Sequence, residues 1–317
     1  GPKTGDPRLF ETMDELCAAV KEQFEYAVKM NVIINNTIEH AYINFTPSPY
    51  HNLMHPGPRK TGIDINMGSC KYNYFGSIGT GLGTAGDSLT AIDQLVFKQK
   101  AVSMDELLKA LKADWEGYES LRNKCISVPK YGMDDDQADK WAKFIADTFM
   151  DAYERHPTCR GGRYLCGFFS VAQNHVLGND TDATPDGRKA NEMLSDSTAP
   201  SQYAVALGPT ATHKSATKAI DTMRTVNGIT FAQNLDINSL QTERELSKWG
   251  DLIRTFVNDG GMSVQYNVIS IEQLKEAQIN PGAYRDLFVR IGGYTARFID
   301  LSKTMQDSII KKATQAC

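Results

Sequence analysis

A glycine-rich segment is the first group of residues whose types and spacing could support chemistry. Gly81-Leu82-Gly83-Thr84-Ala85-Gly86 matches the G-x-G-x-x-G pattern, which holds a dinucleotide pyrophosphate between a strand and a helix. Asp105 and Glu106 follow near the distance expected for a ribose contact. The same acids complete a helix-capping pattern that begins at Ser103, and no second mononucleotide-binding half is visible. We therefore do not predict dinucleotide binding.

Two histidines and a run of acids are candidates for a metal site. His51 and His55 are spaced like a helical pair of zinc ligands, but no Glu follows His51, and Pro56 and Pro58 make a continuous helix improbable. The run Asp134-Asp135-Asp136 suits the positive end of a helix. We predict a helix start at this run and no metal site in the chain.

The nucleophilic side chains show no catalytic pattern. No serine stands in a Gly-x-Ser-x-Gly elbow, and no histidine has a recognisable partner pattern. The cysteines lack CxxC spacing, so we expect reduced thiols rather than a zinc ribbon or a disulfide framework. They are Cys17, Cys70, Cys125, Cys159, Cys166 and Cys317.

The segment Arg290-Ile291-Gly292-Gly293-Tyr294-Thr295-Ala296-Arg297-Phe298 carries the strongest signal. Glycine reaches positive φ without steric cost, so the residues alone predict a strand, a tight Gly-Gly turn and a second strand. The segment also resembles the radical-bearing loop of glycyl radical enzymes. That loop has the pattern Arg-Val-x-Gly-Tyr, followed by a small residue and an Arg-Phe or similar pair. Residues 299–302 and 306–310 are similar to the C-terminal helix of the family.

Four further landmarks that resemble this family occur in order along the chain. They are Lys71-Tyr72-Asn73-Tyr74 with Gly86-Asp87-Ser88-Leu89-Thr90-Ala91-Ile92, then Ala183-Thr184-Pro185-Asp186-Gly187-Arg188-Lys189-Ala190, Pro200-Ser201-Gln202 and Gly208-Pro209-Thr210-Ala211. They look most like the branch that includes diol, choline and hydroxyproline eliminases, aryl-acetate decarboxylases and arylsuccinate synthases. The resemblance therefore extends through the whole chain.

The resemblance implies that Gly293 stores a radical on its α-carbon. Such a radical delocalises into both flanking amides and needs a planar centre, which a Cβ would crowd, so glycine is the residue to expect. A separate radical S-adenosylmethionine activase with an iron-sulfur cluster would remove the hydrogen, and we expect no cofactor bound to this chain. The loop would swing out for activation with Gly292 as a hinge, while Arg290 and Tyr294 would support it.

One feature of the family is missing from this sequence. Relatives pass the radical to a cysteine in a Gly-Cys-x-Glu loop, and no cysteine here has that context. Cys70 is expected to be a buried small residue. The chain starts at Gly1, in a stretch that follows this loop in full-length relatives. We therefore expect a companion polypeptide that carries the cysteine and its glutamate, an activating enzyme, a small-molecule substrate, and a homodimer of the assembled enzyme.

The fold implied by the resemblance is α/β. Residues 1–240 would form the second half of a ten-stranded α/β barrel completed by the companion, and residues 241–317 the glycine radical domain. A large apolar surface should face the companion. The sequence assigns no substrate-binding residue. Four polar residues could reach the cavity: Asn174, His175, Asn234 and Asn238.

The leading functional hypothesis is a lyase that eliminates water or another leaving group from a carbon next to a hydroxylated centre. The alternatives within the family are an aryl-acetate decarboxylase and a synthase that adds a substrate across fumarate. A spare radical subunit that repairs a damaged partner is a further alternative, although such proteins resemble only the terminal domain. An inactive paralogue used for assembly is disfavoured by the intact Gly293 loop.

Capping patterns and periodicity predict the elements that position these segments. We expect helix starts at Thr12, Asp87 and Ser103, and long loops with short strands that line a cavity from about residue 157 to residue 238. The C-terminal part should contain a helix from Thr242 to Gly260, a strand over 263–268, a short helix from Ser270, a strand over 287–291 and a helix over 302–314.

Composition excludes several classes of protein. The chain has 317 residues, 41% of them hydrophobic, which is ample for a folded core. Its 34 Lys and Arg against 38 Asp and Glu give a net charge of -4, so no positive field attracts nucleic acid or anionic lipid. No apolar run approaches membrane-spanning length, and no signal peptide is visible, so we expect a cytoplasmic protein without nucleic-acid or membrane partners.

Overall fold

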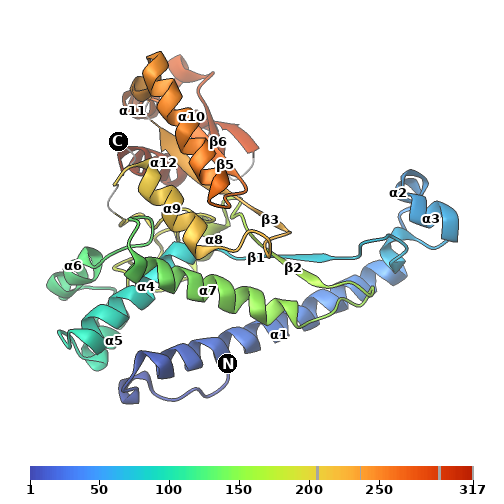
Figure 1. Cartoon of the computed structure of the whole chain (residues 1–317), viewed down its shortest axis with the longest axis horizontal. Coiled ribbons are helices and arrows are strands. Elements are labelled where there is room, and N and C mark those ends of the chain that lie inside the picture. The colour runs from blue at the N-terminus through green and yellow to red at the C-terminus, as the bar shows by residue number, and fades with distance from the viewer. Residues whose placement is uncertain (205–206, 236, 292–293, 316–317) are drawn as a thin grey trace. The chain divides into compact units, whose positions relative to one another are not determined.

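The computed structural model describes the chain except for residues 205–206, 236, 292–293 and 316–317, and except for the side chains of residues 238, 239, 308 and 311–315. It divides into two compact units (Figure 1). The first comprises Gly1–Ser77 and Asp147–Gly167, and the second comprises Ile78–Ala146 and Phe168–Cys317. No helix among the described residues is both long enough and apolar enough to cross a membrane.

The chain combines helices with short strands, as the predicted α/β class requires. The helices are α1 (Met13–Phe45), α2 (Pro49–Met54), α3 (Pro56–Thr61), α4 (Leu82–Ala91), α5 (Met104–Lys112), α6 (Glu119–Ser127), α7 (Asp136–Glu154), α8 (Gln173–Asn179), α9 (Pro209–Ala219), α10 (Glu243–Asn258), α11 (Ile271–Ile279) and α12 (Lys303–Gln315). The strands are β1 (Phe75–Ile78), β2 (Tyr164–Phe168), β3 (Gly228–Ile229), β4 (Phe231–Leu235), β5 (Val264–Val268), β6 (Phe288–Ile291) and β7 (Tyr294–Arg297).

The first unit is built on α1, a single 33-residue helix (Figure 1). The predicted capping box is present, because Thr12 Oγ1 accepts from the amide of Glu15 and the Glu15 carboxylate accepts from the amide of Thr12. Tyr164 in β2 donates to Asn36 Oδ1 at 3.0 Å, which ties β2 to the helix. The start of α1 is therefore set by residues close in sequence, whereas its contact with β2 depends on a hydrogen bond between residues far apart in sequence.

Large apolar side chains lie exposed along the second half of α1. Their exposed fractions are 51% for Ile33, 57% for Ile34, 44% for Ile38, 53% for Tyr42 and 80% for Phe45. Patches of this kind usually mark surfaces that are covered in the assembled protein. The expected apolar surface is therefore present in this unit, whereas completion of a barrel by a companion stays a proposal.

In the second unit, α4 begins at Leu82, so the predicted start at Asp87 is wrong. Gly81 precedes the helix with φ +86°, a conformation that favours glycine. Asp87 instead lies in the middle of the helix and is fully buried. Its carboxylate accepts hydrogen bonds from the Tyr131 amide at 2.7 Å and the Ser201 hydroxyl at 2.6 Å. Burial raises the pKa of Asp87 to about 7.

The glycines of the G-x-G-x-x-G segment let α4 approach its neighbours closely. A Cβ at Gly83 would lie 3.0 Å from the amide nitrogen of Ser201. A Cβ at Gly86 would lie 2.9 Å from the backbone nitrogen and α-carbon of Ala142 in α7. These two glycines therefore serve the close packing of α4.

The acidic run marks the start of α7, as predicted. Asp134 and Asp136 accept from the Lys218 ammonium at 2.6 and 2.7 Å, which links this helix start to the end of α9. Asp139, one turn into α7, is 3% exposed, and burial raises its pKa to about 6. No group of three or more potential metal ligands occurs among the residues that the structure describes.

The C-terminal part contains two separate strand pairs. β4 and β5 are parallel, with Phe231 opposite Val264 and Asn234 opposite Asn267, and α9 and α10 contribute to a small core around Phe231. β6 and β7 are antiparallel, with Ile291 opposite Tyr294, and they pack with α11 and α12 around Leu274, Val289 and Phe298. The predicted strands, the capped helices α10 and α11 and the closing helix are all present within a few residues of their expected bounds.

Helix α9 is an element that the sequence pattern did not predict. Its Ser, Thr and Lys content resembles a loop, but Pro209 occupies the first turn, a position that proline favours in helices. The segment forms a helix because one of its faces is buried in the folded chain. The buried residues are His213, Ser215, Ala216 and Ala219.

Candidate functional site

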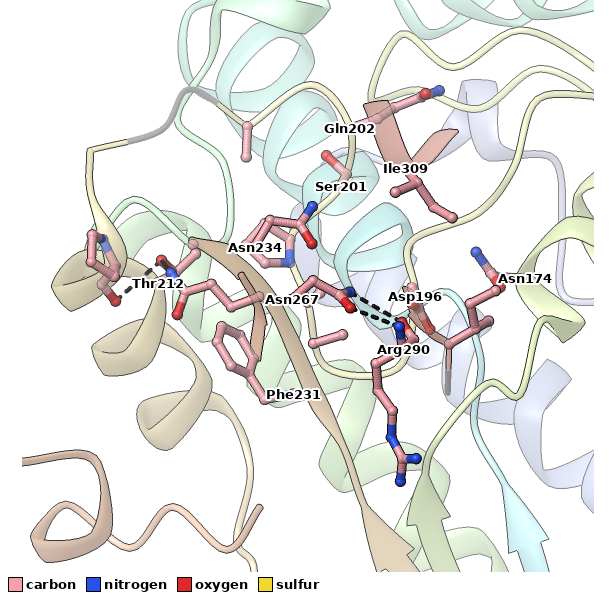
Figure 2. A pocket seen from close by; sticks show the side chains of 18 of the residues that line it. Asn174, Asp196, Ser201, Gln202, Thr212, Phe231, Asn234, Asn267, Arg290 and Ile309 are labelled. Carbon is pink, nitrogen blue, oxygen red and sulfur yellow. Dashed lines mark hydrogen bonds between the residues drawn. The ribbon is translucent and has the colours of Figure 1, made fainter. Parts of the chain in front are cut away.

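A cavity of about 140 Å³ lies within the second unit (Figure 2). Residues from α8, the loop 196–208, α9, β4, β5, β6 and α12 line it. The lining combines polar side chains with apolar ones, among them Phe231, Ile291, Met305 and Ile309. The lining polar side chains are Asn174, His175, Asp196, Ser201, Gln202, Thr212, Gln233, Asn234, Asn267 and Arg290.

The loop that forms one wall is held by reciprocal side-chain and backbone hydrogen bonds. The amide of Ser195 donates to Thr84 Oγ1 at 2.9 Å, and the amide of Thr84 donates to Ser195 Oγ at 3.0 Å. Ser170 and Ser197 form the same kind of pair, at 2.9 and 2.6 Å. Ser201 is anchored through its bond to Asp87. These interactions fix a segment without regular secondary structure against the cavity.

The two parallel strands β4 and β5 contribute amide side chains to the lining. Successive side chains of a strand point to opposite faces, so Asn234 and Asn267, which are opposite each other in the register, share one face. Both line the cavity in Figure 2. Asn174 lies on α8, is 2% exposed, and follows Val171 and Ala172, whose φ angles are +44° and +66°. Positive φ in a β-branched residue is strained, and such strain often occurs beside functional sites.

Three of the four polar residues expected near a cavity do line it. They are Asn174 and His175 in α8 and Asn234 in β4. The side chain of Asn238 lies outside the described part of the chain. Asp196 and Asn267, which the sequence did not single out, also line the cavity, because contacts distant in sequence bring them there.

The hairpin β6–β7 contributes its first strand to the lining of this cavity. Arg290 and Ile291 line it, and Gly292 and Gly293 themselves lie outside the described residues. Tyr294 is 41% exposed, and Arg290 Nη1 donates to Thr295 Oγ1 across the hairpin at 3.1 Å. The hairpin's contribution to the lining thus comes from the two residues that precede Gly292 and Gly293 in the sequence.

A side chain joins this hairpin to the strand β5. Asn267 Oδ1 accepts from the Arg290 amide at 2.7 Å, and Asn267 Nδ2 donates to the Arg290 carbonyl at 3.1 Å, as the dashed lines of Figure 2 show. One asparagine amide therefore satisfies both backbone groups of one hairpin residue.

Beside the cavity, α9 and the parallel strands enclose a buried histidine. His213 is 3% exposed and packs against Phe231, Phe256 and Tyr266, with 3.3 Å between its Nε2 and the Tyr266 hydroxyl. Burial lowers the pKa of His213 to about 4, so the ring is neutral near pH 7.

The remaining predicted candidates lie elsewhere. His51 is in α2, and His55 precedes α3, so the two do not share one helix, as expected from Pro56. Cys70 is half-buried rather than fully buried, because it lies in an irregular segment before β1. Cys159 donates to the buried carboxylate of Glu39 at 3.0 Å, and burial raises its pKa to about 11. Among the described cysteines, none lines the cavity.

Comparison with known proteins decides the family. The model "Pyruvate formate lyase-like" matches residues 1–178, and the model "Glycine radical" matches residues 194–299. The chain belongs to the glycyl radical enzymes. The family resemblance seen in the sequence is thus confirmed, and the described helices and strands are consistent with the α/β class.

Individual glycyl radical enzymes match along nearly the whole chain. Trans-4-hydroxy-L-proline dehydratase from Clostridioides difficile is 36% identical over 316 residues, which are 99% of this chain and 40% of that enzyme. (2S)-3-sulfopropanediol dehydratase from Klebsiella oxytoca is 34% identical, over 98% of this chain and 38% of the relative. The glycerol-bound B12-independent glycerol dehydratase from Clostridium butyricum superposes with a TM-score of 0.96 at 34% identity, over 98% of this chain and 40% of that one. The chain therefore spans about 40% of the length of these glycyl radical enzymes.

Proposed function

We propose that this chain is the radical-storing part of a glycyl radical dehydratase, with Gly293 as the storage residue. The observation that carries the proposal is that Arg290 and Ile291 of the β6–β7 hairpin, which immediately precede Gly292 and Gly293 in the sequence, form part of the cavity wall. The match of the glycine radical model to residues 194–299 supports the same assignment.

The proposed chemistry transfers single hydrogen atoms. A separate radical S-adenosylmethionine activase removes one hydrogen from Gly293, and the resulting radical later takes a hydrogen from a cysteine thiol. An S–H bond breaks and a C–H bond forms, which leaves a thiyl radical. The thiyl takes a hydrogen from a carbon of the substrate, water leaves from the neighbouring carbon, and the product radical recovers the hydrogen from the thiol. The net reaction is an elimination and consumes no oxidant or reductant.

The cysteine is proposed to lie outside these 317 residues, on the companion polypeptide. Two observations support this assignment: the sequence contains no Gly-Cys-x-Glu loop, and none of the described cysteines lines the cavity. In the assembled enzyme, a proposed homodimer, the companion's cysteine would approach the cavity beside Gly293. Arg290, Gly292 and Tyr294 are proposed to support and hinge the radical loop.

Elimination of water from a small hydroxylated substrate is favoured by the relatives. The three reported above are dehydratases by name, and each matches at least 98% of this chain. Five amide side chains line the cavity, and their donors and acceptors can bind the hydroxyl groups of such a substrate. An aryl-acetate decarboxylase, a fumarate-adding synthase and a repair subunit are the alternatives.

Electron paramagnetic resonance tests the proposal. The chain, purified anaerobically with its companion, is treated with an activase and S-adenosylmethionine, and we expect a glycyl doublet. The doublet should be lost in Gly293→Ala. Gly250→Ala is the matched control, because a Cβ at Gly250 would meet only Arg254 Nη1, at 3.6 Å, so its doublet should be unchanged.

Exposure to air gives a second readout. Oxygen should cleave the backbone at the radical, so mass spectrometry should find a fragment that ends near Gly293 in the wild type and in Gly250→Ala only. An intact chain after activation, or a doublet that survives in Gly293→Ala, would contradict the assignment.

A further inference from the structure

The backbone of Arg290 has its hydrogen-bonding groups on the outer side of the hairpin. In an antiparallel pair, hydrogen-bonded and non-hydrogen-bonded residue pairs alternate. The Phe298 amide donates to the Leu287 carbonyl at 2.9 Å, so Leu287 and Phe298 form a hydrogen-bonded pair. Three positions further along the register, Arg290 and Thr295 then form a non-hydrogen-bonded pair. The amide and carbonyl of Arg290 therefore point away from β7.

Asn267 occupies the place that a neighbouring strand would take. Its amide side chain accepts from the Arg290 N–H at 2.7 Å and donates to the Arg290 C=O at 3.1 Å. In the described part of the chain β5 pairs with β4 and β6 pairs with β7, and no ladder joins β5 to β6. A single side chain thus replaces a strand-to-strand ladder at this junction.

The hairpin has its main anchor elsewhere. Val289 and Phe298 are buried with Leu274 in the core formed with α11 and α12, and Gln306 donates to the Phe298 carbonyl at 3.0 Å. Release of Arg290 from Asn267 would therefore leave Val289 and Phe298 packed with Leu274. It would expose the polar groups of Asn267 and Arg290, which water can solvate, and the side of Ile291 that lines the cavity.

We propose that Asn267 is a latch that positions the radical hairpin on the cavity wall and sets how often the hairpin leaves it. The role in radical transfer rests on the proposed function, whereas the latch itself does not. Asn267 is a positioning residue, since among the described residues it holds the hairpin through the backbone of Arg290, three positions before Gly293. Two hydrogen bonds to one residue are strong enough to favour the docked state and weak enough to release it without unfolding a sheet.

Hydrogen exchange of the full chain tests the latch without activation. In Asn267→Ala the amide of Arg290 should exchange about 5- to 30-fold faster, because loss of the two hydrogen bonds should raise the population of the detached state by this factor. Asn234→Ala is the matched control, because Asn234 lies opposite Asn267 in the register, lines the same cavity and has no hydrogen bond to the hairpin among the described residues. Its exchange at Arg290 should equal that of the wild type.

Exchange in β4 and α11 separates a latch from a general loss of structure. These elements should keep wild-type rates in Asn267→Ala. Unchanged exchange at Arg290, or equal acceleration in β4 and α11, would overturn the proposal. If Asn267→Ala does not fold, the isosteric Asn267→Asp replaces it, since it keeps the acceptor, loses the donor and should give a smaller acceleration at the same amide.

The rate of radical formation tests the connection to function. With activase present, the doublet should appear about 5- to 30-fold faster in Asn267→Ala than in the wild type or Asn234→Ala. The reason is that a larger fraction of the molecules would have the hairpin detached and accessible to the activase. Faster exchange with an unchanged activation rate would refute the gating role. Faster exchange with no doublet in any variant would keep the latch and refute the proposed function.

Discussion

Replacement of Gly86 by alanine tests how closely α4 and α7 approach each other. The added Cβ would lie 2.9 Å from the backbone nitrogen and α-carbon of Ala142 and 3.0 Å from its Cβ. Ordinary carbon contacts are about 3.5–4.0 Å, and a backbone cannot rotate away as a side chain can. The two helices must therefore separate, and we expect an overpacking cost of about 3 kcal/mol.

Gly250→Ala in α10 provides the reference for this measurement. Both glycines lie inside helices without a positive φ, so alanine gains about 1 kcal/mol of helix propensity at either position. At Gly250 no backbone lies within contact distance. The propensity gain cancels in the difference between the variants, which isolates the packing cost. We expect Gly86→Ala to be destabilised by about 2 kcal/mol and Gly250→Ala to be stabilised by about 1 kcal/mol.

Urea denaturation followed by tryptophan fluorescence measures the difference. Trp141 precedes Ala142 in α7 and reports on this contact. With a urea dependence of about 3 kcal/mol per molar, the midpoint of Gly86→Ala should lie about 1 M below that of Gly250→Ala. Equal midpoints would refute the reasoning, because they would mean that the third glycine of the motif has no packing role.

Two further substitutions test the electrostatics of the second unit. His213 has a pKa of about 4 in the folded protein against 6.5 as its ordinary value, so this side chain binds more protons in the unfolded chain between these values. The raised pKa values of Asp87 and Asp139 act in the opposite direction in both proteins, so the test is the difference between wild type and His213→Phe. As the pH drops from 6.5 to 4, the unfolding free energy of the wild type relative to His213→Phe should fall by up to about 3 kcal/mol, and a difference in urea midpoints that does not change with pH would contradict this. Lys218→Gln removes the ion pairs with Asp134 and Asp136 and should lower the unfolding free energy by about 1 kcal/mol at low salt. Urea denaturation repeated in roughly 1 M salt should give a smaller loss, and a loss independent of salt would show that these pairs are not its cause.

The sequence by itself determined the features that depend on neighbours along the chain. Thr12 and Thr242 form reciprocal capping bonds with residues three positions later, so their helix starts follow from local spacing. The strands β6 and β7, predicted on either side of Gly292 and Gly293, pair as an antiparallel hairpin, whereas the predicted turn itself lies outside the described residues. The family landmarks, which are contiguous segments, were also accessible from sequence.

Only the tertiary structure decided the features that depend on distant contacts. Asp87 appeared to start a helix, but its bonds to Tyr131 and Ser201, 44 and 114 positions away, place it inside one. The register that sets Asn267 beside Arg290 arises because β5 packs next to the hairpin, and no local pattern encodes this pairing. A helix cap satisfies its own backbone within one turn, whereas a buried carboxylate or a cavity wall needs partners that only the folded chain brings together.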